Sequence, residues 1–224
     1  MSALHLGVVT FGHRGAAAVT EDLQRRLPDF TIVEVGLLDG VPSARLREWV
    51  TDNDSTEATI VHGGDGAELS LQSEPLMARL PAALDALSAG HPDAILFGCA
   101  GPLPELAVPC LSISPFALLR SFVDAVVPVG RVAIIVPSPL HVAATERRYA
   151  GAARTVACRS ASPRDLAAVT ASLAAMVDDD AQLGVLACFD HTDADLVAAR
   201  RAVAAPVVSS RGLAAMALAA LFDG

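Results

Sequence analysis

The sequence predicts an α/β protein built from two doubly wound lobes, each with its own parallel sheet. Short apolar runs alternate with amphipathic segments along all 224 residues, as expected for strands joined by helical crossovers. Both halves of the chain repeat one order of strand, loop, helix, strand, helix and strand. In each half the last strand of this series leads into a cysteine, Cys99 or Cys188.

The first half begins with an apolar strand followed by a glycine-containing loop. Its strands are short apolar runs between turn residues, and its longest helix has apolar residues three and four positions apart. The expected elements are a strand at Leu4–Thr10, a helix ending near Leu27, a strand at Phe30–Val35, a helix at Ser43–Val50, a strand or edge element at Ala58–His62, a helix at Leu76–Ala89 and a strand at Ala94–Gly98. The polar stretch Leu37–Pro75 makes this half longer, and we interpret it as an insertion.

The second half repeats the pattern without that insertion. Ser162 and Pro163 suit the cap and first turn of a helix. The expected elements are a strand at Arg131–Val136, a helix ending near Ala150, a strand at Arg154–Ala157, a helix at Pro163–Val177, a strand at Leu183–Ala187, a helix at Asp193–Ala204, a strand at Pro206–Val208 and a helix at Gly212–Leu221. We predict a first lobe of residues 1–103 with 209–224 and a second of residues 104–208. A single Rossmann-like sheet without internal symmetry is the alternative.

Composition and charge narrow the possible partners. The chain is 53% hydrophobic, yet no apolar run approaches the roughly 20 residues that a membrane span needs. The formal charge of −9 argues against nucleic acid, which favours a basic surface. The opening residues lack the basic and apolar regions of a signal peptide, so we expect a cytoplasmic protein. A small-molecule substrate and a homodimer are the expected partners.

Lysine is absent, because all sixteen basic residues are arginines. This absence excludes a pyridoxal phosphate Schiff base and a Walker A loop, both of which need a lysine. The four cysteines form no Cys-x-x-Cys motif and have no zinc-site spacing, so we expect reduced thiols, no metal and no cofactor.

Cys99 and Cys188 are the candidate catalytic residues. Each follows a predicted parallel strand, and open α/β sheets bind ligands at that edge. A thiolate can act as a base and a thiol as an acid, so two thiols facing one cleft suit cofactor-free proton transfer at carbon. The alternative is that both are small buried hydrophobic residues, which is how cysteine most often behaves. Cys110 and Cys158 are interpreted as structural.

The loops after the predicted strands supply the candidate substrate-binding residues, which are Thr10, Gly12, Arg14, Ala100, Gly101, Ser138, Asp190 and His191. The backbone amides of residues 98–101 and 189–191 are expected to open helices and to stabilise a developing enolate. His191 is a candidate cation or acid beside Cys188. Turn formation, a solvated arginine and helix capping are the alternatives for these residues.

The chain resembles the AroM family of the aspartate/glutamate/hydantoin racemase superfamily. The resemblance rests on the order and spacing of Leu6–Gly12, Leu37–Gly40, Asp93–Leu96, Arg131–Pro137, the Cys188 strand and Ala205–Ser210. It implies two pseudo-symmetric α/β lobes with an active site in the cleft between them. It also implies chemistry of the kind catalysed by cofactor-independent racemases, maleate isomerases and arylmalonate decarboxylases. The racemases use two cysteines, one per lobe, which match Cys99 and Cys188.

The residues after each cysteine differ from the racemase pattern. Cys99 is followed by Ala100-Gly101-Pro102, where racemases have an amide and a hydroxyl residue, and Cys188 is followed by Phe189, where they have threonine. The resemblance therefore implies a racemase or isomerase of a small carboxylate or related carbonyl compound, without an assigned amino acid. A decarboxylase that uses one thiol and a non-catalytic small-molecule binder are the alternatives.

Overall fold

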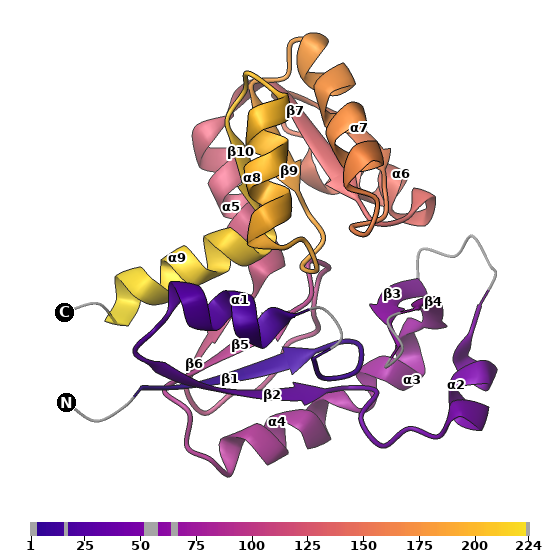
Figure 1. The fold of residues 1–224 in the computed structure, drawn as a ribbon, viewed down its shortest axis with the longest axis vertical. Coiled ribbons are helices and arrows are strands. Elements are labelled where there is room, and N and C mark those ends of the chain that lie inside the picture. The colour runs from indigo at the N-terminus through magenta and orange to yellow at the C-terminus, as the bar shows by residue number, and fades with distance from the viewer. Residues whose placement is uncertain (1–3, 16–17, 52–57, 64–66, 223–224) are drawn as a thin grey trace. The chain divides into compact units, whose positions relative to one another are not determined.

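A computed structural model describes residues 4–15, 18–51, 58–63 and 67–222 of the chain. Its contacts divide the protein into two compact units (Figure 1). The first unit holds the chain up to Cys99, then Leu103–Ser114 and the end from Ala215, and the second holds Ala100–Pro102 and Pro115–Ala214. Each unit contains one four-stranded parallel sheet, which confirms the predicted α/β class and its two lobes.

The first sheet has the strand order β2-β1-β5-β6. Its strands are β1 (Leu4–Thr10), β2 (Phe30–Gly36), β5 (Ala94–Gly98) and β6 (Leu111–Ile113). Helices α1 (Val19–Arg26) and α4 (Leu80–Ser88) cover opposite faces of this sheet (Figure 1). The apolar runs that predicted β1, β2 and β5 are therefore strands of one sheet, of which β1 and β5 are almost wholly buried and β2 forms the partly exposed edge.

The second sheet repeats this topology. Its order β10-β9-β7-β8, taken from the other end, matches β2-β1-β5-β6 strand for strand. Its strands are β7 (Val129–Val136), β8 (Ala153–Ser160), β9 (Leu183–Leu186) and β10 (Val207–Ser209). The predicted internal repeat is thus present in the strand order, and the single-sheet alternative is wrong.

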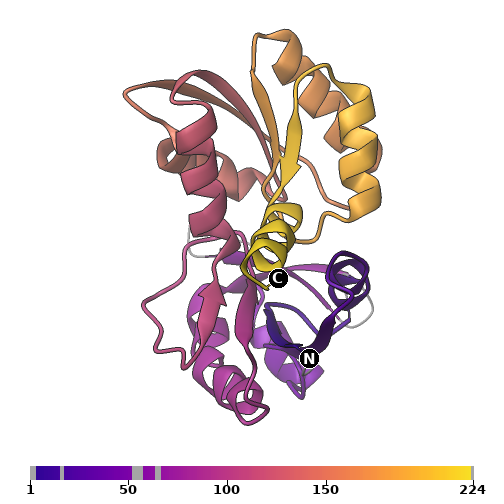
Figure 2. The same cartoon turned by 90° about the vertical axis from the view of Figure 1, so that its left-hand side faces the viewer.

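Both faces of the second sheet are buried. The helices around it are α5 (Pro115–Val126), α6 (Val142–Tyr149), α7 (Leu166–Asp178), α8 (Asp193–Ala202) and α9 (Ser210–Phe222), with a short 3₁₀ turn η1 (Pro139–His141). Val132 and Ile134 pack in a core with α5 and α6, whereas Ala133 and Ile135 pack with α7 and α8. Helix α5 and the pair α7 and α8 lie on opposite faces of the sheet (Figure 2). The period-two alternation of a strand supplies both cores.

The predicted insertion lies outside the parallel sheets. It contains α2 (Ser43–Trp49) and an antiparallel hairpin of β3 (Ala58–His62) with β4 (Glu68–Gln72). The helix predicted at Leu76–Ala89 is two helices, α3 (Ser73–Met77) and α4. Pro81 lies in the first turn of α4, where a proline is tolerated because its missing N–H needs no partner, so a new helix starts there.

The predicted lobe boundaries differ from the observed division of the chain. Residues 104–114, expected in the second lobe, belong to the first unit because β6 pairs with β5. Helix α5, which the sequence analysis did not predict, belongs to the second unit. Residues 209–214 also belong to the second unit, since β10 pairs with β9 and α9 begins directly after it.

The last part of α9 packs within the first unit. Phe222 meets Phe30 edge to face, with ring centroids 5.3 Å apart.

None of the helices in the described ranges is long and apolar enough to span a membrane.

Candidate functional site

Thr10 and Cys99 lie together at the C-terminal edge of the first sheet. Thr10 ends β1 and is the register partner of Gly98, the last residue of β5, so Cys99 directly follows that pair. Cys99 is half-buried. The Thr10 hydroxyl is buried and has no hydrogen-bond partner among the described residues. A buried hydroxyl in this state can serve a ligand that supplies the missing partner.

Gly12 and Arg14 lie in the turn after β1, which Asp39 ties to the turn after β2. The Asp39 carboxylate accepts hydrogen bonds from the backbone N–H groups of Arg14 at 3.1 Å and Gly36 at 3.0 Å. The Arg14 side chain is 67% exposed, with Nε 3.6 Å from the same carboxylate. Arg14 is therefore a surface arginine paired with Asp39.

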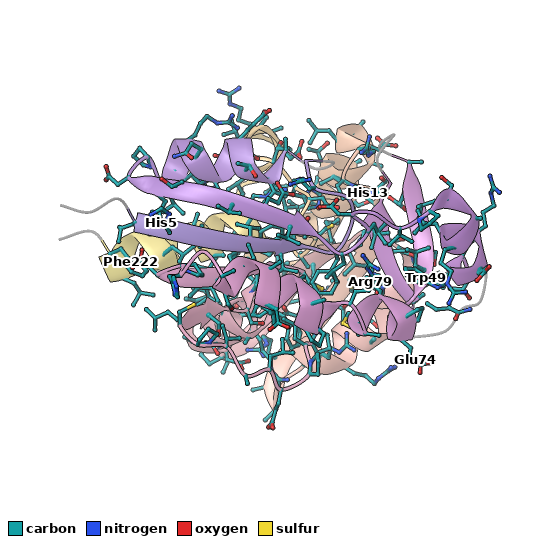
Figure 3. All side chains as sticks on the ribbon, turned by 90° about the horizontal axis from the view of Figure 1, so that it is seen from below. His5, His13, Trp49, Glu74, Arg79 and Phe222 are labelled. Carbon is teal, nitrogen blue, oxygen red and sulfur yellow. The ribbon has the colours of Figure 1, made fainter. Side chains whose placement is uncertain are left out.

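Two further side chains hold this pair of turns. Arg79 donates from Nε to the carbonyl of Leu37 at 2.5 Å and from Nη2 to that of Asp39 at 2.9 Å. His13 Nδ1 lies 3.8 Å from the Asp39 carboxylate (Arg79 and His13 are labelled in Figure 3). These hydrogen bonds therefore fix the backbone of the loop that carries Gly12, one of the predicted site residues.

Ala100 and Gly101 follow Cys99 in an irregular connection that leads to β6. Both are half-buried, and no helix begins in residues 99–110. The expectation that this loop opens a helix is wrong. Pro102, Pro104 and Pro109 explain the difference, because proline lacks an N–H and restricts the residue before it to extended conformations.

Cys188 and Ser138 lie at the C-terminal edge of the second sheet. The N–H of Ala187 donates to the carbonyl of Ile135 at 3.0 Å, which extends the β7–β9 ladder up to the residue before Cys188. Ser138 is buried, and its Oγ accepts from the N–H of Leu140 at 3.3 Å as the cap of η1. The turn-forming role that the sequence left open for Ser138 is therefore present, as the cap of η1.

His191 is buried directly before α8. Its Nδ1 lies 4.0 Å from the Asp195 carboxylate, and neither ring nitrogen has a hydrogen-bond partner within the described part of the chain. Burial lowers the pKa of His191 to about 4, against the opposing effects of Asp195 and Asp190. The imidazole is thus neutral near pH 7, which disfavours the cationic role considered for it.

The loop between Cys188 and α8 does precede a helix N-terminus, as predicted. Thr192 caps α8, accepting from the N–H of Asp195 at 3.2 Å, while the Asp195 carboxylate accepts from the N–H of Thr192 at 2.7 Å. This reciprocal capping box occupies those two amides. Asp190 lies half-buried in the preceding turn and interacts electrostatically with His191 and Arg211.

Arg211 is the residue that the sequence analysis missed. It follows β10 in the first turn of α9 and is only 1% exposed. Its Nε donates to the carbonyl of Phe189 at 2.8 Å, and its guanidinium carbon lies 5.2 Å from the centre of the Phe189 ring. A cation in the first turn of a helix meets the positive end of the helix dipole. An arginine in the first turn of a helix that directly follows a strand is therefore unusual, and this position is the sequence signal that could have indicated Arg211.

The other two cysteines are held as thiols. Burial raises the pKa of Cys158 to about 12, with a smaller effect of Glu146 in the same direction. Burial and Asp93 raise the pKa of Cys110 as well. Both residues fit the structural role expected for them. No group of three His, Cys, Asp or Glu side chains that could hold a metal ion occurs among the residues that the structure describes.

Cys99 and Cys188 occupy matching positions in the two sheets. Cys99 comes one residue after Gly98, which pairs with the last residue of β1. Cys188 comes one residue after Ala187, whose N–H donates to the carbonyl of Ile135. Ile135 is the residue before Val136, the last residue of β7. The repeat of the fold therefore delivers one thiol to the same edge of each sheet.

The fold is shared with several enzymes of known structure. Glutamate racemase isoform RacE1 from Bacillus anthracis is similar with a TM-score of 0.64 at 14% identity, over 100% of this chain and 83% of the other. The maleate isomerase Iso from Pseudomonas putida S16 has a TM-score of 0.54 at 14% identity, over 99% and 94% of the two chains. An arylmalonate decarboxylase has a TM-score of 0.56 at 15% identity, over 98% and 92%.

Sequence comparison gives the family. No curated protein matches the chain in sequence. The profile of the AroM family, described as AroM protein, matches residues 6–222, which is nearly the whole chain. The protein with these two thiol-bearing sheets is therefore a member of the AroM family, and it shares its fold with a glutamate racemase.

Proposed function

We propose that this protein is a cofactor-independent racemase or isomerase that moves a proton at a carbon atom next to a carbonyl group. The observation that carries the proposal is the matching position of Cys99 and Cys188 at the C-terminal edges of two sheets with the same strand order. The similar structures are named for a racemase, an isomerase and a decarboxylase, which supports an enzyme over a binding protein.

The two thiols would share the reaction as base and acid. The thiolate of one cysteine takes the proton from the carbon, and the electron pair of the C–H bond moves into the carbonyl group to form an enolate. The thiol of the other cysteine then gives its proton to the opposite face of that carbon. The first cysteine ends as a thiol and the second as a thiolate, so the reverse reaction uses the exchanged roles.

An enolate needs donors close to its oxygen, because a thiolate is a weak base for a carbon acid. The buried Thr10 hydroxyl, which has no partner among the described residues, is the strongest candidate donor. The Ser138 hydroxyl accepts a hydrogen bond as the cap of η1 and so keeps its own proton for a ligand. A small carboxylate or related carbonyl compound fits donors of this kind.

The test is the exchange of the substrate's α-proton with solvent deuterium, followed by proton NMR. Amino acids, hydantoins and dicarboxylates are offered to the wild type, to Cys99→Ala, to Cys188→Ala and to the control Cys110→Ala. We expect exchange with the wild type and the control, and a loss of about 100-fold or more in each single variant, as for a general acid or base. Wild-type exchange rates in both Cys99→Ala and Cys188→Ala would refute the two-thiol mechanism.

A decarboxylase that uses one thiol is the second candidate. The observation that favours it is the difference between the two thiol loops, since Cys188 lies beside the buried cation Arg211 whereas Cys99 leads into a proline-rich connection. In this reaction the C–C bond to a carboxylate breaks and that carboxylate leaves as CO₂. The electron pair of the bond moves into the remaining carbonyl group to form an enolate, whose carbon then takes a proton from one thiol. Release of CO₂ from a substituted malonate, abolished in only one of the two cysteine variants, would favour this candidate.

A further inference from the structure

Arg211 is fixed beside the loop that begins at Cys188. Ser209 and Leu186 are register partners on β10 and β9, so Arg211 and Cys188 each stand two residues beyond that pair at the same sheet edge. The Arg211 side chain is almost completely buried, and its Nε is held by the Phe189 carbonyl at 2.8 Å. The guanidinium also stacks 5.2 Å from the centre of the Phe189 ring, which leaves it little freedom.

The Arg211 guanidinium interacts with Cys188 and with several acidic side chains. The electrostatic partners of the Arg211 guanidinium are Asp190, Cys188, Asp193 and Asp195. His191, between these groups in the chain, is neutral near pH 7 and adds no positive charge. Carboxylates near a thiol disfavour its thiolate, and a guanidinium favours it. Arginine keeps its proton even where burial lowers its pKa, as it does for Arg211.

We propose that Arg211 holds Cys188 as a thiolate in the resting protein and so makes Cys188 the thiol that takes the proton first. Arg211 is a positioning residue, because it acts through Cys188 and its buried side chain bonds to the Phe189 carbonyl. The assignment of base to Cys188 rests on the proposed function, whereas the charge state of the thiol does not. Cys99 then supplies the second proton as a thiol.

The two sheets differ at the position that Arg211 occupies. Ile113 is the register partner of Leu96, and Val208 is the register partner of Val185. Phe116 follows Ile113 by three residues, as Arg211 follows Val208. Phe116 is uncharged and meets the ring of Tyr149, with centroids 6.2 Å apart. The internal repeat thus matches the two thiols but places a charged side chain at this position in the second sheet.

The test is the alkylation rate of each cysteine by iodoacetamide as a function of pH, measured by peptide mass spectrometry. The variants are Arg211→Met, Arg211→Lys and the control Arg200→Met. Arg200 is exposed and donates from Nε to the Val207 carbonyl of β10 at 3.0 Å. Arg211→Met should move the Cys188 profile upward by about 1–2 pH units, a rate about 10–100-fold lower near pH 7. Arg211→Lys should restore most of the rate, and Arg200→Met should match the wild type.

Two measurements separate a charge effect from loss of structure. The Cys158 alkylation rate in the same samples must stay low, because the pKa of that half-buried thiol is raised to about 12 in the folded protein. If Arg211→Met does not fold, Asp190→Asn tests the same electrostatics in the opposite direction and should speed alkylation of Cys188. An unchanged Cys188 profile in a folded Arg211→Met, or in Asp190→Asn, would overturn the proposal.

No substrate enters this experiment, so its result is independent of turnover. A shifted Cys188 profile together with no deuterium exchange would leave the role of Arg211 intact and remove the proposed reaction. Exchange by the wild type together with an unshifted profile in Arg211→Met would remove the role of Arg211 alone.

Discussion

Replacement of Gly36 by alanine tests whether close contact between the turns after β1 and β2 stabilises the edge of the first sheet. Gly36 ends β2 as the register partner of Thr10. A Cβ at this position would lie 2.5 Å from the Arg14 nitrogen, 2.7 Å from the Gly12 oxygen and 2.8 Å from an Asp39 carboxylate oxygen. Two of these three atoms belong to backbone, so the neighbouring turn itself would have to move.

The expected cost follows from these contacts. Overpacking of this kind costs about 1–3 kcal/mol. Movement of the turn would also weaken the Asp39 hydrogen bonds to the N–H groups of Arg14 and Gly36, at about 1 kcal/mol each. We therefore expect Gly36→Ala to lower the free energy of unfolding by about 3–5 kcal/mol. The same shift would displace Thr10, so the α-proton exchange rate should fall as well.

Urea unfolding gives this free energy, and Gly90→Ala is the matched control. A Cβ at Gly90 would approach only the Leu87 carbonyl, at the ordinary contact distance of 3.4 Å. Gly90→Ala should stay within about 0.5 kcal/mol of the wild type. If Gly36→Ala were as stable as Gly90→Ala, the close contact between the turns after β1 and β2 would not fix the edge of the first sheet.

Three further predictions concern the buried side chains of Arg154 and His191 and the half-buried thiol of Cys158. Arg154 donates to the buried carbonyls of Tyr149, Val123 and Val127; Arg154→Met should lower the free energy of unfolding by about 2–4 kcal/mol, and the exposed Arg147→Met by less than about 0.5. His191 has a folded pKa of about 4 against 6.5 ordinarily, so the unfolded chain binds more protons between these values. The contribution of His191 to the free energy of unfolding should therefore be fully present above about pH 6.5, and about 3 kcal/mol of it should be lost as the pH drops to about 4. If urea unfolding of His191→Gln shows the same loss, this prediction is wrong. Cys158, with a pKa of about 12, should react with iodoacetamide near pH 8 about a thousand-fold more slowly than a peptide thiol, and a rate near that of the peptide would show that the site opens.

The sequence predicted most of the strands because their signal is local. The apolar run of β1 was predicted with its observed bounds, and so was that of β5, since turn residues bound both. Helix α5 is absent from the predicted elements, although Leu119 and Val123 lie four residues apart on one of its faces. Its place in the second unit depends on packing with β7, which no local pattern reports.

The candidate site divides in the same way. The two cysteines could be found from sequence, because strand ends in a repeated βα pattern locate the ligand edge of each sheet. The charge around them could not. His191 looked like a cation because of its distance from Cys188 in the chain, yet burial keeps it neutral. Arg211, which follows Cys188 by 23 positions in the sequence, becomes its neighbour only because β10 pairs with β9.

The sequence by itself determined the fold class, the internal repeat and the place of Cys99 and Cys188 at the ends of two strands, since each depends on the pattern of residues along the chain. The tertiary structure alone decided which turns Asp39 joins, which hydroxyl lacks a partner and which cation lies beside Cys188. These properties depend on burial and on side chains from separate strands, and both arise only when the sheet has formed.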